Sequence, residues 1–416
     1  FQNAKDMVGD AGWLDSSDPG YKYNAFDRNS TGGFTLGGPI VKDKLFFFVS
    51  AEQQKVTEIG ADSANGLDPS LGEGPSTSNK VSPGDLQRVI DIANGYGIDT
   101  GGFGGSTGVS LEDKRYLAKL DWNITDNHRA SLSWNHTKED RPVLLGNSTD
   151  SVGVNNYRYT QAIKNDNISL QFFDDWTTNF STEAKIGYQH FKQDTVTPTQ
   201  APQISVSMDG YGSPQVYLGE EQYRHYNKID TKEISLYFAG TYFAGDHTIK
   251  GGIYAQRKKI FNLFGRTQFG AYSFDSIDDF ANGDYYSFNL YQPAPGYTLD
   301  DVAGQWTYTQ YSPFIQDTWQ VDDQLSLQYG VRVNIPDANK KPLYNAAFEQ
   351  AFGYPNNTTM TPGNKVVEPR FSFNYQFDTE RMTQLRGGFG LFQTSPPTVW
   401  LTNPYQNNGL TVATYY

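Results

Sequence analysis

Six pairs of alternating segments, each pair joined by a tight turn, constrain the fold of this chain more than any other feature. In the clearest pair, every second residue is apolar from Tyr116 to Trp122 and again from Ala130 to Trp134, with a short polar turn between them. A period of two is typical of strands with one apolar face. The pattern recurs and predicts twelve strands in pairs near 32–54, 114–138, 165–191, 229–261, 309–334 and 367–393.

The segments between these pairs are long and rich in Gly, Pro, Asn, Asp and Tyr; the longest spans about residues 55–113. Short turns at one end and long loops at the other are typical of outer-membrane barrels. A propeller would show a blade period, and the sequence has none. The pattern therefore predicts an all-β chain, an antiparallel transmembrane β-barrel with short periplasmic turns and long extracellular loops.

Composition agrees with a barrel and excludes several other classes. Hydrophobic residues make up only 37% of the chain, yet aromatic residues reach 15%. Amphipathic rings suit the two membrane interfaces. The longest apolar run, Leu45–Val49, is far shorter than the roughly 18 residues of a membrane-spanning helix. The absence of Cys removes disulfides and thiolate sites, and the net charge of −13 argues against a nucleic-acid partner.

One helix is expected inside the first long loop. Ser82-Pro83-Gly84-Asp85 is a typical helix start, and Leu86, Val89, Ile90 and Ala93 follow at helical spacing up to Gly95. We interpret this helix as part of the loop rather than of the barrel.

Three stretches resemble the Oar-like TonB-dependent receptors. Gly32–Phe48, which reads GGFTLGGPIVKDKLFFF, resembles two barrel strands of that family with their turn. Phe314–Trp319 followed by Leu325–Arg332 resembles a strand pair of many TonB-dependent receptors, and Glu368–Phe373 with Leu385–Phe392 resembles another hairpin of the group. These stretches stand near the start, three-quarters along and near the end, so the resemblance covers most of the chain.

The resemblance implies a barrel of about 22 strands with an N-terminal plug, of which residues 32–393 would supply about 12 strands. Residues 1–31 would form an extracellular loop, and residues 394–416 the start of a further loop or strand. Nothing before Gly32 reads as a plug or a TonB-contacting segment, so we expect the sequence to be a partial barrel; a complete 12-stranded barrel is the alternative. The family also implies the outer membrane of a Gram-negative bacterium.

The aromatic residues of one loop are the candidate ligand contacts. Tyr and Trp offer rigid, amphipathic contact area, as binding surfaces often do. Packing of the loop on itself, or extension of the strands above the membrane, is the alternative explanation. The candidates are Tyr285, Tyr286, Phe288, Tyr291, Tyr297 and Trp306.

The remaining polar motifs have simpler explanations. An acidic cluster, Asp275, Asp278, Asp279 and Asp284, could hold a loop-bound Ca²⁺, although its spacing does not match an EF-hand and a solvated loop is favoured. The segment 104–108 matches a nucleophile elbow in letters only, because it stands in a Gly-rich loop. The five His residues are scattered without metal-ligand spacing. We therefore expect no enzyme, no catalytic residue, no metal and no cofactor.

Polar residues on the strands are expected to face the lumen: Lys119, Gln171, Glu183, Lys185, Lys250, Gln256, Gln328, Arg332 and Arg386. By resemblance, loops would capture an extracellular ligand (a peptide, glycan or protein), and the TonB complex would drive its import through the plugged barrel. Outer-membrane lipid and lipopolysaccharide would be the surrounding partners. The alternatives are an adhesion or surface-assembly barrel that holds a protein without transport, a membrane hydrolase and, more weakly, a soluble all-β binding protein.

Overall fold

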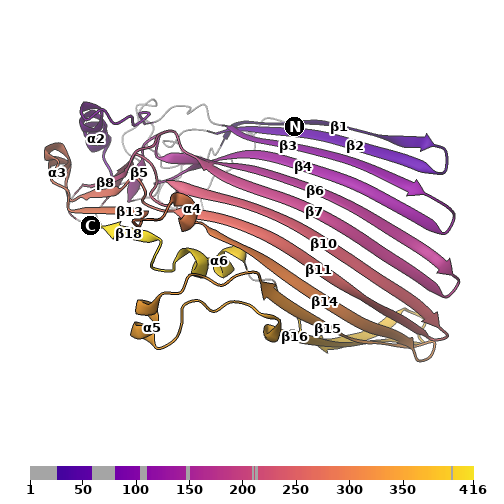
Figure 1. Ribbon diagram of the computed structural model, residues 1–416. Coiled ribbons are helices and arrows are strands. Elements are labelled where there is room, and N and C mark those ends of the chain that lie inside the picture. The colour runs from indigo at the N-terminus through magenta and orange to yellow at the C-terminus, as the bar shows by residue number, and fades with distance from the viewer. Residues whose placement is uncertain are drawn as a thin grey trace.

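The computed structural model describes residues 26–58, 80–103, 110–146, 150–208, 210, 214–394 and 397–416. Within them, twelve strands form one antiparallel sheet, here called the wall, in which neighbours follow one another along the chain (Figure 1). The strands are β1 (Phe26–Val41), β2 (Leu45–Glu58), β3 (Ser110–Asn123), β4 (His128–Leu144), β6 (Arg158–Thr177), β7 (Phe180–Val196), β10 (Tyr226–Ala244), β11 (His247–Gly265), β14 (Gly304–Gln320), β15 (Leu325–Ala338), β16 (Val366–Phe377) and β17 (Thr383–Gly390).

All six predicted hairpins are present, and their short turns lie together at one end of the wall (Figure 1). At the first turn Asp43 adopts a φ of 62°, a left-handed conformation that Asp tolerates. Several strands are longer than predicted: β1 begins at Phe26, inside the segment 1–31 expected to be a loop. Residues 27–31 read DRNST and contain no apolar residue, so the period-two signal does not reach them. Residues 1–25 lie outside the described part.

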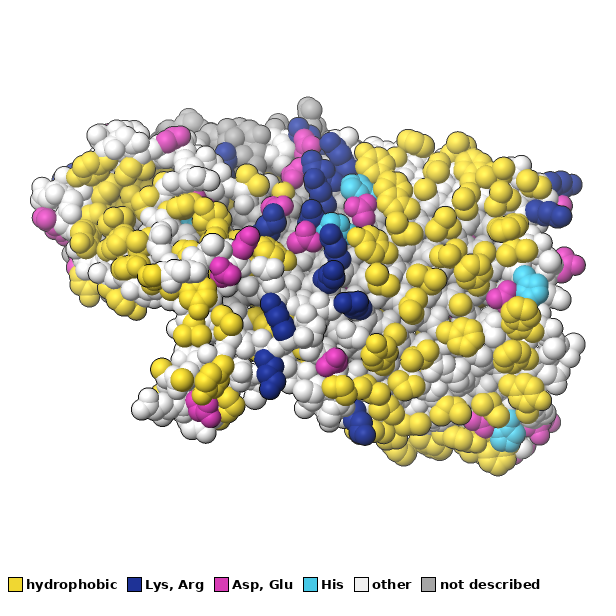
Figure 2. All heavy atoms as spheres, viewed as in Figure 1, with side chains coloured by type: hydrophobic (Ala, Val, Ile, Leu, Met, Phe, Trp, Pro, Cys, Tyr) yellow, Lys and Arg dark blue, Asp and Glu magenta, His cyan; other side chains and the backbone are white. Residues whose placement is uncertain are grey.

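The two faces of the wall differ in polarity. Directly paired residues of neighbouring strands share a face, and successive residues of one strand alternate. On β10, Ile234, Leu236 and Phe238 are about half exposed on the outer face, whereas Ser235 and Tyr237 point inward. Figure 2 views the outer face and shows apolar side chains covering the part of the wall nearest the short turns. An exposed apolar band of this size marks a surface that meets something other than water.

The long loops fold together into a second unit, here called the loop domain. It contains a six-stranded sheet in the order β18-β13-β12-β8-β9-β5, together with the helices α2 (Pro83–Gly95) and α3 (Ile277–Asn282). The pairs β8–β12 and β5–β9 are parallel. The strands are β5 (Ser151–Gly153), β8 (Gln203–Ser207), β9 (Gln215–Leu218), β12 (Ala271–Phe274), β13 (Ser287–Pro293) and β18 (Val412–Tyr415).

The loop domain has its own hydrophobic core. Leu86, Val89, Ile90 and Ala93 of α2 are buried against strands of the small sheet and against Phe280 of α3. The helix predicted from Ser82 to Gly95 is confirmed: the Ser82 hydroxyl accepts a hydrogen bond from the Asp85 backbone at 3.1 Å. It does more than decorate a loop, because its apolar face is part of this core.

Short helices complete the loop end: α4 (Leu299–Val302), α5 (Ala346–Phe352), η3 (Pro362–Asn364) and α6 (Thr398–Gln406). The segment expected to start a further loop or strand, 394–416, contains α6 packed beside β14, and then β18 on the small sheet. Among the described residues, no helix is long and apolar enough to cross a membrane.

Candidate functional site

The inner face of the wall carries every residue that the sequence placed in the lumen. The pairing register puts Lys119, Gln171, Glu183, Lys185, Lys250, Gln256, Gln328, Arg332 and Arg386 there. Charges on this face meet across strands: the Lys250 ammonium lies 3.5 Å from the Glu183 carboxylate, and Lys258 lies 2.9 Å from Glu233. At these two points of the polar inner face, opposite charges therefore neutralise one another.

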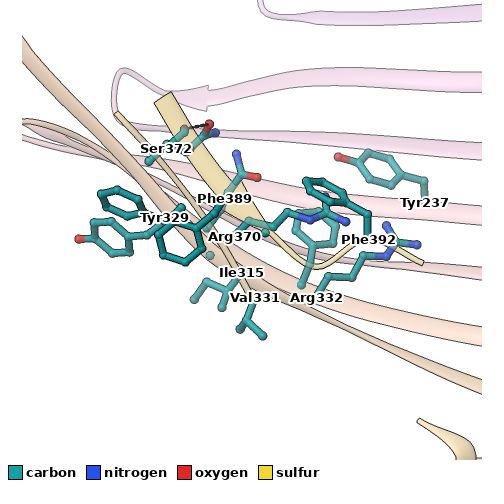
Figure 3. A pocket seen from close by; sticks show the side chains of 16 residues that line it. Tyr237, Ile315, Tyr329, Val331, Arg332, Arg370, Ser372, Phe389 and Phe392 are labelled. Atoms are coloured by element: carbon teal, nitrogen blue, oxygen red, sulfur yellow. Dashed lines mark hydrogen bonds between the residues drawn. The ribbon is translucent and has the colours of Figure 1, made fainter. Parts of the chain in front are cut away.

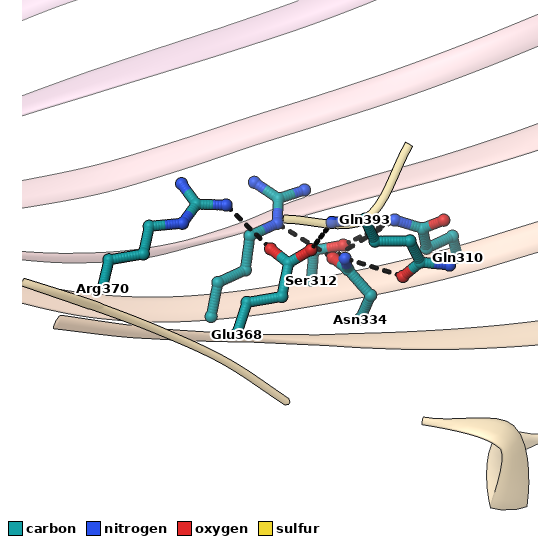
Figure 4. Close-up of polar contacts among 7 residues, drawn as sticks. Gln310, Ser312, Asn334, Glu368, Arg370 and Gln393 are labelled. Carbon is teal, nitrogen blue, oxygen red and sulfur yellow. Dashed lines mark hydrogen bonds and ion pairs between the residues drawn. The ribbon is translucent and has the colours of Figure 1, made fainter. Parts of the chain in front are cut away.

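A hydrogen-bonded network crosses the inner face between β14 and β16 (Figure 4). Glu368, only 1% exposed, accepts from the Arg370 guanidinium at 2.8 Å and from the Gln393 backbone N–H. The Asn334 amide donates to the Gln393 side chain at 2.9 Å and accepts from Arg332 Nε at 2.9 Å. A buried carboxylate is tolerated only when paired and hydrogen-bonded, and both conditions are met here.

A cavity of about 540 Å³ lies beside this network (Figure 3). Its inner lining includes Arg332, Arg370 and Tyr237, and the Arg370 guanidinium stands 4.5 Å from the centre of the Phe392 ring. Near the glycines at 330, 388 and 390, outward-facing side chains also line the cavity: Ile315, Tyr329, Val331, Phe371 and Phe389. Sequence reasoning placed Arg332 in the lumen but missed the cavity, whose walls come from distant strands.

Two guanidinium groups beside an aromatic ring suit an anionic or aromatic group. Arg370 is paired with Glu368, whereas no ion pair to Arg332 is found among the described residues. Arg332 also lies 5.7 Å from the Tyr254 ring centre, which helps to hold its planar group in place. A guanidinium presents donors in a fork that matches carboxylates and phosphates. The site can bind such a group by hydrogen bonds and stacking.

Four of the six aromatic candidates gather on or beside β13. Tyr285 and Tyr286 are 55% and 62% exposed. The Phe288 ring lies 4.6 Å from that of Tyr272, and Arg266 stacks 4.5 Å from the centre of Tyr291. Tyr285 and Phe288 lie close together, with 6.4 Å between their ring centres, and with the exposed Tyr286 they are here called the aromatic surface of the loop domain. Tyr291 points to the opposite face of β13 from Phe288. Ligand contact by these residues stays a prediction.

The other two candidates lie apart from that surface. Tyr297 is 37% exposed, near the start of α4. Trp306 is 3% exposed, because α6 covers it: its ring stacks on Tyr405 at 5.0 Å and its Nε1–H donates to the Thr402 hydroxyl at 3.1 Å. In this structure Trp306 anchors α6 and presents almost no surface to a ligand.

The acidic cluster flanks a short helix: Asp278 and Asp279 lie in the first turn of α3, Asp275 precedes the helix and Asp284 follows it. The Ser276 hydroxyl caps α3 by accepting from the Asp279 backbone N–H at 3.0 Å, and the Asp279 carboxylate accepts from the same hydroxyl at 2.7 Å. Asp278 pairs with Arg88 of α2. Acidic residues in a first helical turn are stabilising. Among the described residues, no group of three or more His, Asp or Glu side chains is arranged to hold a metal ion. The segment 104–108 lies outside the described residues.

The hydrogen-bond partners of the histidines could not be predicted from the sequence. Four of the five His residues lie within hydrogen-bond distance of an Asp on a neighbouring wall strand, at 2.7–2.9 Å. The pairs are His128–Asp174, His136–Asp166, His190–Asp230 and His247–Asp317. They are separated by at least 30 residues, so only strand pairing brings them together.

The fifth histidine belongs to the loop domain. The Phe269 backbone N–H donates to His225 Nδ1 at 3.0 Å, so Nε2 carries the hydrogen and donates to the Glu220 carbonyl at 3.1 Å. Burial lowers the pKa of His225 to about 4, and burial raises the pKa of the Glu220 carboxyl to about 8. Near neutral pH both side chains are therefore uncharged.

The comparison with protein families decides what the wall is. The sequence signature described as outer membrane beta barrel domain matches residues 93–416, which is more than half of the chain. The chain belongs to the outer membrane beta barrel domain family. It therefore resides in the bacterial outer membrane, with its apolar band in lipid and its short turns on the periplasmic side. A search of curated proteins gave no match.

Solved structures share the fold of this outer-membrane barrel. A ferric enterobactin receptor of Pseudomonas aeruginosa is 13% identical, with a TM-score of 0.52; the match covers 87% of this chain and 41% of the receptor. The FrpB iron transporter of Neisseria meningitidis is also 13% identical, with a TM-score of 0.50 and coverage of 92% and 46%. The chain spans less than half of the solved structures that it matches. The twelve-stranded wall corresponds to a portion of such barrels, as predicted.

Membership of the family fixes the orientation of the sites. The loop domain with its aromatic surface is extracellular, and the inner face with Glu368, Arg332 and Arg370 faces the lumen.

Proposed function

We propose that this chain forms part of the barrel of a TonB-dependent outer-membrane transporter of the Oar-like group. The observation that carries the proposal is the inner face: paired charges and the guanidinium-lined cavity line the lumen below a folded extracellular domain. A lumen of this kind suits contact with a polar plug and passage of a polar ligand. The sequence resemblance of Gly32–Phe48 and of the two later hairpins supports the same assignment.

The two edges of the wall support a larger barrel. Within the described sheet, β1 and β17 are the outermost strands and each pairs on one side. Unpaired backbone groups cannot face lipid, so these edges require further strands. In the proposed mechanism, the extracellular loops capture the ligand, a plug moves when TonB pulls, and the ligand passes along the inner face. The work is conformational and involves no covalent step.

A single-thiol experiment tests the proposal, because this chain contains no Cys. In the full-length protein, with any cysteine elsewhere replaced, Gln328→Cys places one thiol on the lumen face. Tyr329→Cys places one on the lipid face as the matched control. Living cells are treated with an impermeable maleimide, with TonB intact or inactivated, in medium conditioned by the source organism.

A TonB-driven transporter predicts that labelling at position 328 is severalfold faster with active TonB, and that labelling at position 329 does not depend on TonB. Equal labelling at position 328 in both backgrounds would reject TonB-coupled import. It would favour the alternative, a surface-assembly barrel that holds a protein partner.

A further inference from the structure

A row of lysines crosses the outer face of the wall at directly paired positions. Lys114 pairs with Lys138, Lys138 with Lys164, and Lys164 with Lys192, from β3 to β7. Neighbouring strands are about 4.8 Å apart, so the backbone positions of the four lysines span about 14 Å across the sheet. Figure 2 shows dark blue side chains crossing the wall between its apolar band and the loop domain.

Like charges at directly opposite positions destabilise a sheet. Acidic side chains offset part of this cost: Lys138 lies 3.3 Å from Asp140, Lys192 lies 3.5 Å from Asp230, and Lys114 lies 3.7 Å from Glu112. Lys164, in the middle of the row, is exposed, and no ion pair to it is found among the described residues. The row therefore keeps unneutralised positive charge in a chain whose net charge is −13.

The row continues into a groove of about 530 Å³ on the next strands. Four lysines line it, Lys228, Lys232, Lys259 and Lys340, with one carboxylate, Asp230. Lys232 and Lys259 again stand directly opposite each other. Lys228 lies 3.4 Å from Asp194, but no ion pair to Lys232, Lys259 or Lys340 is found in the described part of the chain. The groove thus gathers four lysines around a space that a single carboxylate lines.

The position of these lysines along the strands, relative to the apolar band, shows which layer of the membrane surrounds them. Two residues nearer the periplasm, the same strands present Tyr116 and the His136–Asp166 pair. Another two residues in the same direction, toward the periplasm, these strands present Trp134, Ile168 and other lipid-facing side chains. One such step is about 7 Å along a strand. The lysines therefore stand at the level of lipid headgroups, just outside the hydrocarbon, on the extracellular side.

We infer that this lysine belt, defined as the row and the groove together, binds the phosphate groups of an anionic glycolipid in the outer leaflet. A phosphorylated lipid matches both the lysines and the apolar band below them. Its phosphate neutralises the opposed lysines, and its acyl chains pack along the apolar band. A free phosphate would match the charge but gain nothing from the band. The belt thus extends the proposed function, because it sets the lipid partner and the depth of the barrel in the membrane.

The test uses the full-length protein purified in detergent and three probes: bisphosphorylated lipid A, its dephosphorylated form, and inorganic phosphate in large excess as a competitor. The variant combines Lys114→Gln, Lys138→Gln, Lys164→Gln and Lys192→Gln. The matched control combines Lys42→Gln and Lys44→Gln, which remove exposed lysines at the periplasmic turn. Lipid binding is measured by native mass spectrometry, and the heat-dependent gel shift of the barrel shows that each protein is folded.

We expect the four-lysine variant to bind bisphosphorylated lipid A at least tenfold more weakly than the wild type, since each Lys near an anionic surface contributes about 1 kcal/mol. The turn control should bind as the wild type does, dephosphorylated lipid A should bind weakly to all three, and inorganic phosphate should not compete. Unchanged binding by a folded variant, or equal binding of the dephosphorylated lipid, would overturn the inference. Full competition by inorganic phosphate would show a plain anion site instead.

Discussion

The wall and the loop domain solve the problem of burying apolar surface in opposite ways. On the wall, Ile234, Leu236 and Phe238 are half exposed on the outer face, because lipid takes the place of a protein core. In the loop domain, Val206, Val216 and Phe280 are buried together in one hydrophobic core. One chain therefore contains a sheet that depends on the membrane and a sheet that depends on its own packing.

The difference teaches which interactions hold each region. Wall strands follow one another along the chain and satisfy their backbone groups pair by pair, so the wall needs no core. The short strands of the loop domain come from separate loops and pair in parallel as well as antiparallel. A core mutation should therefore disturb only the loop domain, and a lipid-face mutation only the wall.

The largest expected effect is that of Phe280→Ala in the loop domain. The Phe280 side chain is 2% exposed and packs edge-to-face on Phe274 at 5.0 Å. Truncating a buried Phe costs about 3–5 kcal/mol. We expect limited proteolysis to cut the extracellular loops of this variant while the heat-dependent gel shift of the wall stays normal. Phe34→Ala, at a lipid-facing position that is 64% exposed, is the control and should leave the loops resistant. Simultaneous loss of both regions would show that they fold as one unit.

The converse change is Leu236→Arg on the wall. Leu236 faces outward in the middle of the apolar band, and a cation there costs about 2–4 kcal/mol. We expect a lower free energy of unfolding in lipid vesicles, measured by urea titration. Ser235→Arg on the adjacent inner face is the control, with a change below about 1 kcal/mol because the lumen is polar. Equal losses for both variants would contradict the assignment of the two faces.

The same contrast explains how much of the fold could be predicted from the sequence. The wall could be predicted, because contact with lipid requires an apolar residue at every second position, as at Leu132 and Trp134. Turn residues between the alternating segments mark where each strand ends. The extension of β1 to Phe26 lacked that signal, because the sequence has no apolar residue from 27 to 31. The small sheet was missed, because strands as short as β5 carry too few residues for a period and their partners lie in other loops.

The candidate sites also divide into those that could be predicted from the sequence and those that could not. Lumen residues such as Arg332 were predictable, because their face follows from parity along a strand. The cavity around Arg370, the opposed lysines and the His–Asp pairs were not, because each needs the lateral register of strands that are far apart in sequence. Trp306 has an aromatic neighbourhood in the sequence, yet its burial depends on α6, about a hundred residues later.

A pH dependence should appear in the loop domain. Burial raises the pKa of Glu220 to about 8, so the folded domain keeps a proton that the unfolded chain releases near pH 4.5. This stabilisation is complete below about pH 4.5 and is lost as the pH rises through 8. The slope is at most about 1.4 kcal/mol per pH unit. We expect amide exchange in β8 and β9, corrected for intrinsic rates, to show less protection at pH 8 than at pH 6, and Glu220→Gln to abolish the difference. An unchanged pH dependence in that variant would assign it to another group.

The smallest expected effect is that of Trp306→Phe, at the junction of the two regions. Trp306 belongs to β14 of the wall, and its Nε1–H donates to the hydroxyl of Thr402 in α6, a side chain that is fully buried. Phenylalanine keeps the stacking on Tyr405 but cannot donate, so the substitution should cost about 1 kcal/mol. We expect faster amide exchange in α6, with no change in the core of the small sheet. Tyr286→Phe, on the exposed aromatic surface, is the control and should change neither. If exchange in the small sheet also rose, α6 would couple the wall to the loop domain.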